Sequence, residues 1–173
     1  MAERADWEDV LTTLVAERGD ALVRYAFLLC GNADDARDLV QTGLEKTFGR
    51  LRNGFALEKA EAYVRKAIAS TYLDRGRRIT RWRHQAHLHV TEESTPSATG
   101  HVEARLDMQR HLRVLSPRER ACVVLRYYDD RKVDEIAQEL GISSGSVKRY
   151  LSDGLAKLAS ALDDARREQH VRS

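Results

Sequence analysis

Apolar residues recur three and four positions apart along most of this chain, the spacing of amphipathic α-helices. The stripes predict helices over about 7–29, 33–51, 60–78 or beyond, 101–115 and 117–128, followed by a helical hairpin around Gly141. The N-terminal half shows no alternation of apolar and polar residues of the kind that marks a strand. The pattern therefore predicts an all-α fold.

Residues that stop or start helices divide these stripes. Gly19 predicts a possible break in the first helix, and Gly31 with Asn32 predicts the turn after it, followed by acids that suit a helix N-terminus. Asn53 and Gly54 interrupt the period again. Further on, "SPRE" predicts a capping box, with Ser116 as the cap, Pro117 at the first helical position and Glu119 reaching back.

The helical stripe is lost from about residue 87 to residue 100, where Ser, Thr, His, Pro and Gly gather. Such a composition is typical of a flexible linker. We therefore expect two small helical domains, over 1–86 and 101–165, joined by a linker at 87–100. Residues 166–173 form a polar tail that we expect to fray.

The segment "EIAQELGISSGSVKRYL", residues 135–151, has the layout of a helix-turn-helix. Ala137 leaves room where two helices cross, and Gly141 suits a turn that requires positive φ. Ser143 or Ser144 is placed to cap the second helix. The buried stripe consists of Ile136, Leu140, Ile142, Val147 and Leu151.

The second helix of this hairpin carries the polar side chains expected to face DNA. They are Ser144, Ser146, Lys148, Arg149 and Ser152, with Asp153 beside them. The alternative is an ordinary helical hairpin inside a core. We favour DNA binding because the alanine, the glycine and the apolar residues all fall in register.

A second basic segment, "RKAIASTYLDRGRRITRWR" at residues 65–83, lies in the first domain. Its seven cations face a single acid, Asp74, and aromatic residues are interleaved with them. The cations are Arg65, Lys66, Arg75, Arg77, Arg78, Arg81 and Arg83, and the aromatics are Tyr63, Tyr72 and Trp82. Such a face suits phosphate neutralisation and stacking on unpaired bases. The alternative is a solvated basic face with Tyr72 in the core.

Composition narrows the class of protein. The 173 residues carry a net charge of only +2, so any basic surface must be local. Cys30 and Cys122 fall in apolar helical stretches and are expected to be free thiols. The charged start has no apolar leader and no run approaches 18 apolar residues, so we expect a soluble, cytoplasmic chain without membrane insertion.

Enzymatic function finds no support in the sequence. A phosphate-binding glycine-rich loop, a nucleophile elbow and a cysteine with a plausible base are all missing. The cluster His84, His87, His89 and His101 resembles metal ligands, but it lies in and beside the linker with no cysteine near. We expect no catalytic residue, no metal and no cofactor.

Four stretches in order resemble the extracytoplasmic-function (ECF) group of bacterial sigma factors, the initiation subunits of RNA polymerase. They are "DARDLVQTGLEKTF" (35–48), "EAYVRKAIASTYLDRGRR" (61–78), "LSPRERACVVLRYYDD" (115–130) and "VDEIAQELGISSGSVKRYLSDGLAKL" (133–158). The details are most similar to the actinobacterial SigE-like branch. The resemblance implies two helical domains similar to sigma regions 2 and 4 and covers nearly the whole chain except the linker and the ends.

The resemblance implies that the first domain docks on the polymerase core, at the clamp helices of the β′ subunit, with the β subunit as a further partner. The matching residues are Asp38, Gln41, Thr42 and Glu45. Much of the family has an acid where this chain has Thr42, which changes the expected polar contacts but not the surface.

The resemblance also implies that promoter DNA is read in two places. The loop at 52–55 and the helix after it resemble the part that holds the melted minus-ten strand, through Asn53, Arg65, Lys66, Tyr72, Arg75, Arg77 and Arg78. An Asn-Gly pair is also a common turn. The hairpin residues would face the minus-thirty-five element. Many relatives have Arg or Ala where this chain has Asp153 and Gly154.

Two further properties follow from the resemblance. The linker would thread through the polymerase, where Glu92 and Glu93 suit a positively charged channel. An anti-sigma protein is a common partner in the group, although no separate motif marks its site.

The rival interpretation is a stand-alone helix-turn-helix regulator. It leaves the basic helix unexplained, and the first domain shows neither the heptad seam of a dimer interface nor the cluster of polar residues of a ligand pocket.

Overall fold

The structure is a computed structural model that describes residues 7–49, 56–86 and 108–171. All regular structure in these ranges is helical, with no strand among them, which confirms the all-α prediction. The chain divides into two compact units, Met1–Val90 and Thr91–Ser173. The predicted linker at 87–100 and the turn at Asn53 and Gly54 lie outside the described residues.

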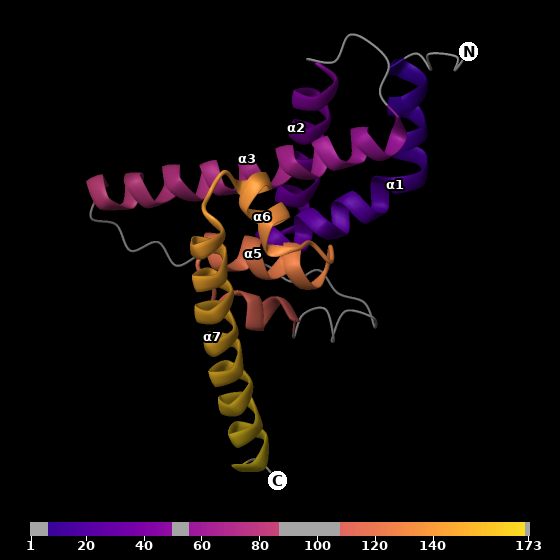
Figure 1. The fold of residues 1–173 in the computed structure, drawn as a ribbon. Coiled ribbons are helices and arrows are strands. Elements are labelled where there is room, and N and C mark those ends of the chain that lie inside the picture. The colour runs from indigo at the N-terminus through magenta and orange to yellow at the C-terminus, as the bar shows by residue number, and fades with distance from the viewer. Residues whose placement is uncertain (1–6, 50–55, 87–107, 172–173) are drawn as a thin grey trace. The chain divides into compact units, whose positions relative to one another are not determined.

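Unit 1 contains three helices, α1 (Trp7–Cys30), α2 (Ala33–Phe48) and α3 (Leu57–Ala86). Each packs against the other two, as Figure 1 shows. The stripes predicted from the sequence form this core, because they supply most of its buried apolar side chains. The largest of them that are completely or almost completely buried are Leu14, Leu22, Tyr25, Leu29, Leu39, Val64 and Ile68.

The turn between α1 and α2 follows the prediction. Gly31 has a φ of 74°, a conformation that favours glycine. The Asn32 side chain caps α2 by accepting from the backbone N–H groups of Asp34 and Asp35 at 2.9 and 3.0 Å. These contacts fix where α2 begins.

Two boundaries in unit 1 differ from the sequence prediction. α1 is one helix without a break at Gly19, although its ribbon bends along its length (Figure 1). α2 ends at Phe48, not Leu51, and the Gly49 N–H makes the last helix-type hydrogen bond, to the Glu45 carbonyl at 2.8 Å. The sequence leaves the end of α3 open beyond residue 78, and α3 reaches Ala86.

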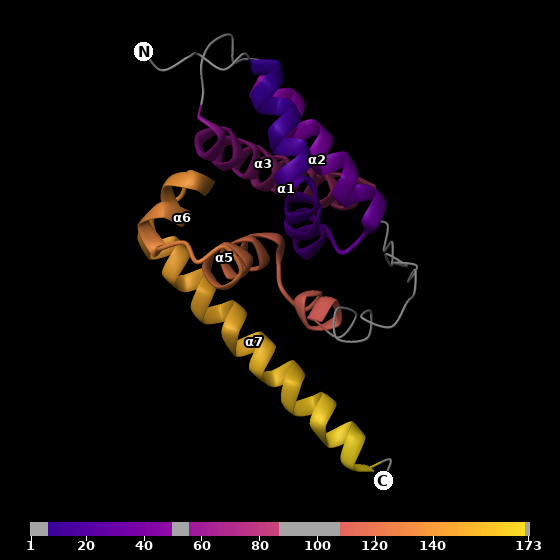
Figure 2. The same ribbon diagram turned by 90° about the vertical axis from the view of Figure 1, so that its right-hand side faces the viewer.

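Unit 2 contains a helical turn at 108–112 and the helices α5 (Pro117–Tyr127), α6 (Val133–Leu140) and α7 (Ser144–Val171), drawn in orange and yellow in Figure 2. α5 lies at the centre of this unit. Every residue from Glu119 to Leu125 is buried. α5 packs against both α6 and α7.

The start of α5 is held by the capping box predicted from the sequence. Ser116 Oγ accepts from the Glu119 N–H at 3.4 Å, and Glu119 Oε2 accepts from the Ser116 N–H at 2.8 Å. The preceding helix ends at residue 112 rather than at Leu115. The cap residue Ser116 has an extended backbone, because Pro117 disfavours a helical conformation in the residue before it.

α6 and α7 form the predicted helix-turn-helix. Gly141 ends α6 with a φ of 65°, in the left-handed region. Ser143, not Ser144, caps α7, because its Oγ accepts from the Ser146 N–H at 3.1 Å. Ile136 and Val147 are fully buried at the crossing.

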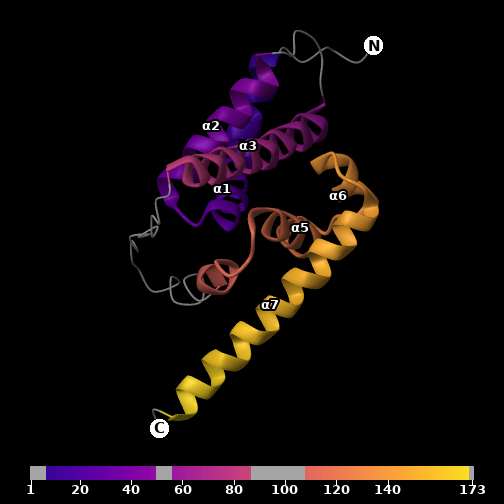
Figure 3. The same cartoon turned by 90° about the vertical axis from the view of Figure 1, so that its left-hand side faces the viewer.

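α7 continues to Val171, into the stretch that the sequence predicts to be a polar tail, and its C-terminal half runs beyond α5 and α6 (Figure 3). Ala, Leu, Arg, Glu and Gln dominate this stretch and have high intrinsic helix propensity, so it stays helical with little packing. None of the described helices is long and apolar enough to cross a membrane.

Candidate functional site

The exposed face of α2 carries three acids and one amide in a single row. Successive residues turn by about 100° around a helix, so Asp34, Asp38, Gln41 and Glu45 line up opposite the buried Leu39 and its neighbours. All four side chains are exposed. We call these four residues the acidic α2 stripe. Thr42, the fourth predicted docking residue, is half-buried at its edge.

Contacts within the acidic α2 stripe order its side chains. Gln41 Nε2 donates to Glu45 Oε1 at 3.0 Å. Asp38 Oδ2 accepts from Arg75 of α3 at 2.6 Å, which joins a residue predicted to bind polymerase to one predicted to bind DNA. Both side chains are more than a third exposed, so this ion pair contributes at most about 1 kcal/mol to stability.

The outer face of α3 carries a second row, which we call the basic α3 stripe. Its members recur three, four or seven positions apart and all are exposed. They are Lys59, Tyr63, Lys66, Ser70, Arg77, Arg81 and His84. Lys66 and Arg77 of the predicted DNA-binding set lie on this stripe. The exposed Asp74, four positions after Ser70 and three before Arg77, lies in the same row, 3.9 Å from Arg77.

Arg65 does not belong to the basic α3 stripe, contrary to the sequence prediction. Its side chain is only 12% exposed and pairs with Glu61 at 3.1 Å. Its guanidinium also lies 5.1 Å from the centre of the Tyr25 ring, a cation–π contact inside the three-helix bundle. Tyr72 is half-buried. The structure therefore gives Arg65 a packing role in unit 1.

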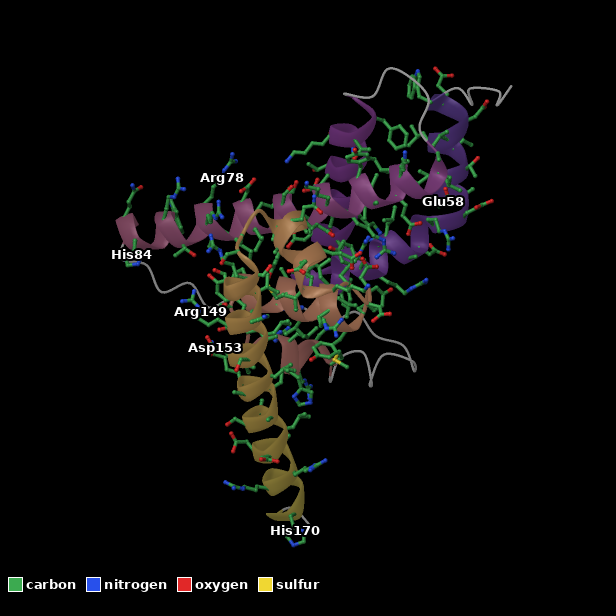
Figure 4. The ribbon with its side chains drawn as sticks, viewed as in Figure 1. Glu58, Arg78, His84, Arg149, Asp153 and His170 are labelled. Atoms are coloured by element: carbon green, nitrogen blue, oxygen red, sulfur yellow. The ribbon has the colours of Figure 1, made fainter. Side chains whose placement is uncertain are left out.

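The C-terminal end of α3 exposes basic and apolar side chains together. No described residue of α3 beyond Leu73 is buried. Ile79 and Trp82 are exposed there, and Arg78 and His84 project from different sides of the helix in Figure 4. Asn53, the residue predicted to contact a base, lies outside the described residues.

The predicted minus-thirty-five residues of α7 differ in how directly they face outward. Arg149 and Ser152 lie opposite the buried Val147 and Leu151, whereas Lys148 lies on the flank. The side chains of Lys148, Arg149 and Ser152 are all exposed. Asp153 projects to the same side of α7 as Arg149 (Figure 4).

The other two predicted residues of α7 are engaged within the hairpin. Ser144 Oγ donates to Asp134 Oδ1 of α6 at 2.6 Å. Ser146 Oγ lies 2.9 Å from Ser143 Oγ. Both serines thus hold the turn that sets the angle of α7.

Arg118 and Tyr150, which lie beside Arg149, were not predicted from the sequence. Arg118 Nη1 donates to Tyr150 Oη at 3.0 Å, linking α5 to α7. The guanidinium carbons of Arg118 and Arg149 lie 5.9 and 5.2 Å from the Tyr150 ring centre. The Arg118 hydrogen bond, aided by Arg149, lowers the pKa of Tyr150 despite the opposing effect of burial.

Metal ligation has no counterpart in the described part of the chain. No group of three or more His, Cys, Asp or Glu side chains gathers there to hold an ion. Of the four clustered histidines only His84 lies in the described ranges, and its side chain is exposed on α3.

Comparison with known proteins connects both units to transcription. A family model described as "Sigma-70, region 4" matches residues 105–158. The RNA polymerase sigma-E factor of Streptomyces coelicolor is 34% identical over 167 residues, which cover 94% of this chain and 89% of that protein. The sigma-E factor of Streptomyces avermitilis is 37% identical, over 86% of this chain and 83% of that protein.

More distant relatives follow the same pattern. The ECF RNA polymerase sigma factor SigE of Mycolicibacterium smegmatis is 29% identical over 93% of this chain and 63% of its own length. Among solved structures, the sigma factor RpoE of Bartonella quintana, in complex with the anti-sigma factor NepR, matches with a TM-score of 0.66. That match covers 88% of this chain and 96% of that chain at 20% identity, so it supports the fold.

Proposed function

Because this chain belongs to the ECF family of RNA polymerase sigma factors, we propose a division of its role in transcription initiation between the two units. Unit 1 docks on the polymerase core through the acidic α2 stripe and holds the melted minus-ten strand along α3. Unit 2 reads the minus-thirty-five element through α7. The site of action is then the cytoplasm, where the polymerase is found.

The observation that carries this proposal is the outward face of α7. Arg149 and Ser152 are exposed on a helix whose opposite face is buried, within the segment that the region 4 family matches. A helix presented in this way enters a major groove, where an arginine meets base edges and neighbouring cations meet phosphates.

Charge complementarity supports docking through α2. The acidic α2 stripe presents Asp34, Asp38 and Glu45 to solvent on one side of unit 1. Acids in this arrangement suit a basic partner helix, and they favour correct orientation as well as affinity. We therefore add Asp34 to the predicted docking residues.

The basic α3 stripe supports a role in holding single-stranded DNA. Lys66, Arg77 and Arg81 are spaced to follow a phosphate backbone, and Tyr63 and Trp82 expose aromatic rings near them. Arg78 extends the positive charge on the adjacent side. Asn53 remains a candidate base contact on sequence grounds alone.

We also propose that an anti-sigma protein regulates this chain. The solved relative with a similar fold was crystallised with such a partner. The described surface of this chain does not single out a site for one.

The rival function is a stand-alone helix-turn-helix regulator. Gel filtration with purified core polymerase separates the two functions, because a sigma factor co-elutes with core whereas the rival binds a DNA palindrome by itself. The enzyme class is disfavoured because the relatives that match most of this chain are sigma factors.

The docking surface is tested by the double variant Asp38→Ala, Gln41→Ala in the same binding experiment. We expect core affinity to fall about tenfold, the equivalent of about 1.4 kcal/mol, while the helical content is unchanged. The matched control is Thr13→Ala, Glu17→Ala, which removes one acid and one neutral polar group from the exposed face of α1. Equal core affinities for the two double variants would refute the docking assignment.

A further inference from the structure

Arg118, Tyr150 and Arg149 form a cluster that places two cations against one phenol. Arg118 is the second residue of α5, and Arg149 and Tyr150 are neighbours on α7. Within the described part of the chain, no ion pair joins either arginine to a carboxylate. We call these three residues the Arg–Tyr–Arg cluster.

The position of Arg118 is fixed by the contacts of the next residue, Glu119. Glu119 is buried and accepts from Lys157 Nζ of α7 at 2.9 Å on both of its oxygens. It also accepts from the Ser116 N–H at 2.8 Å. The start of α5 is therefore anchored to α7, and Arg118 is held at the edge of the surface that carries Arg149.

The cluster brings together two like charges whose repulsion an anion would relieve. The Tyr150 ring accepts both guanidinium groups through cation–π contacts, but a neutral phenol compensates their charge only in part. Arginine in particular suits bidentate binding of a phosphate oxygen pair. The cluster is thus built to receive an anionic group alongside α7.

We propose that Arg118 binds a DNA backbone phosphate beside the minus-thirty-five element, and that Tyr150 positions it next to Arg149. This proposal rests on the proposed function of unit 2. Arg118 lies on the helix next to the reading helix, which favours contact with the phosphates that border the groove. Such a contact fixes the register in which Arg149 meets the base edges.

The test measures binding of the holoenzyme, assembled from the full chain and purified core, to a promoter at several salt concentrations. Arg118→Ala should lower the slope of log K against log salt by about 0.9, while leaving the order of preference among minus-thirty-five sequences unchanged. Between 50 and 200 mM salt, the variant should lose about 3- to 4-fold less affinity than the parent.

Tyr150→Phe tests the positioning role because it keeps the ring and removes the hydroxyl that accepts from Arg118. It should weaken promoter binding less than Arg118→Ala does. In the Arg118→Ala background it should add no further loss, because the two changes remove the same contact. Additive losses in the double variant would overturn the positioning role of Tyr150.

The matched control is Arg167→Ala. It removes one exposed cation from the face of α7 that carries Arg149, five helical turns beyond Arg149. If Arg118→Ala has the same slope and affinity as this control while Arg149→Ala weakens promoter binding, the Arg118 proposal is wrong and the function of unit 2 stands. If Arg149→Ala is also without effect, the function of unit 2 fails, and the Arg118 proposal fails with it.

Discussion

Two helical glycines of unit 1 have different surroundings, although the sequence pattern does not distinguish them. A Cβ at Gly43 would lie 2.9 Å from Ile68 Cγ1 and 3.2 Å from the Val64 carbonyl oxygen, where α2 meets α3. A Cβ at Gly19 would meet only Val15 Cγ1, at an ordinary 3.9 Å. Gly43 is therefore needed for the close approach of two helices, whereas Gly19 is not.

We predict opposite effects of alanine at these two positions. Gly19→Ala should raise the free energy of unfolding of unit 1 by about 0.5–1 kcal/mol through helix propensity. Gly43→Ala should lower it by about 1–2 kcal/mol, because the overpacking exceeds the same propensity gain. Hydrogen exchange of α2 and α3 amides in urea would measure both. A stabilising Gly43→Ala would show that the α2–α3 contact is looser than described.

Glu119 couples the stability of unit 2 to pH. Burial raises its pKa, but the hydrogen bond from Lys157 and the Ser116 N–H outweigh burial and lower the pKa below the ordinary 4.5. A carboxylate with a lowered folded-state pKa stabilises the fold in full above about pH 4.5. That contribution is lost as the pH falls through the lower, folded-state pKa.

We predict that Glu119→Gln lowers the free energy of unfolding of unit 2 by about 1–2 kcal/mol at pH 7. Glutamine still serves the capping box, so the loss reflects the contact with Lys157. The difference from the parent should shrink as the pH falls below 4.5 and on through the lower folded-state pKa, where the parent carboxylate becomes neutral in the folded protein as well. Urea titrations between pH 7 and pH 3 measure this. A difference that stays constant over that range would contradict the assignment.

At the scale of single elements, the sequence predicted the helices, caps and turns that depend on the spacing of neighbouring residues. The amphipathic stripes predicted the helices, and Ser116, Pro117 and Glu119 predicted the start of α5. The hairpin turn followed from Gly141, because a φ of 65° favours glycine. These features depend on residues no more than a few positions apart.

Features that depend on packing between distant helices were not predicted. Arg65 was expected to be exposed, but Tyr25 and Glu61 hold it in the bundle. Arg118 and Tyr150 are 32 positions apart and meet only because α5 packs on α7. A run of cations in the sequence does not reveal which of them a neighbouring helix will cover.

The face of α7 also separates Arg149 from Lys148, which the sequence left equivalent. We predict that Arg149→Ala costs about 1–3 kcal/mol of promoter binding and relaxes preference at one base pair, because Arg149 is central on the outward face. Lys148→Ala, on the flank, should weaken all sequences alike and lower the salt slope by about one. Transcription from a library randomised in the minus-thirty-five element, beside salt titrations, measures both. A change of preference caused by Lys148→Ala alone would reverse the two roles.

At the scale of the whole molecule, each unit carries its own core. The buried side chains of unit 1 come from α1, α2 and α3, and those of unit 2 come from α5, α6, α7 and the turn before α5. On the proposed function the two units bind separate promoter elements, and each has a buried core with which to fold by itself. Independent unfolding is therefore the expected behaviour of the full chain.

Cys122 offers a probe for this independence, because it is fully buried in α5 and burial raises the pKa of its thiol to about 12. The thiolate is the reactive form, so an alkylating reagent at pH 8 should modify Cys122 only when unit 2 unfolds. We predict that Leu125→Ala, which empties a buried site in α5, lowers the urea concentration at which Cys122 reacts by an amount equivalent to about 2–5 kcal/mol.

The matched variant Leu39→Ala empties an equally buried site in α2 of unit 1 and should leave the urea dependence of Cys122 labelling unchanged. Hydrogen exchange of α2 amides would confirm that this second variant does destabilise unit 1. If Leu39→Ala shifted Cys122 labelling as much as Leu125→Ala does, the two units would unfold as one. Unit 1 could then not be assigned core docking separately from the DNA reading of unit 2, because a variant in either unit would disturb both.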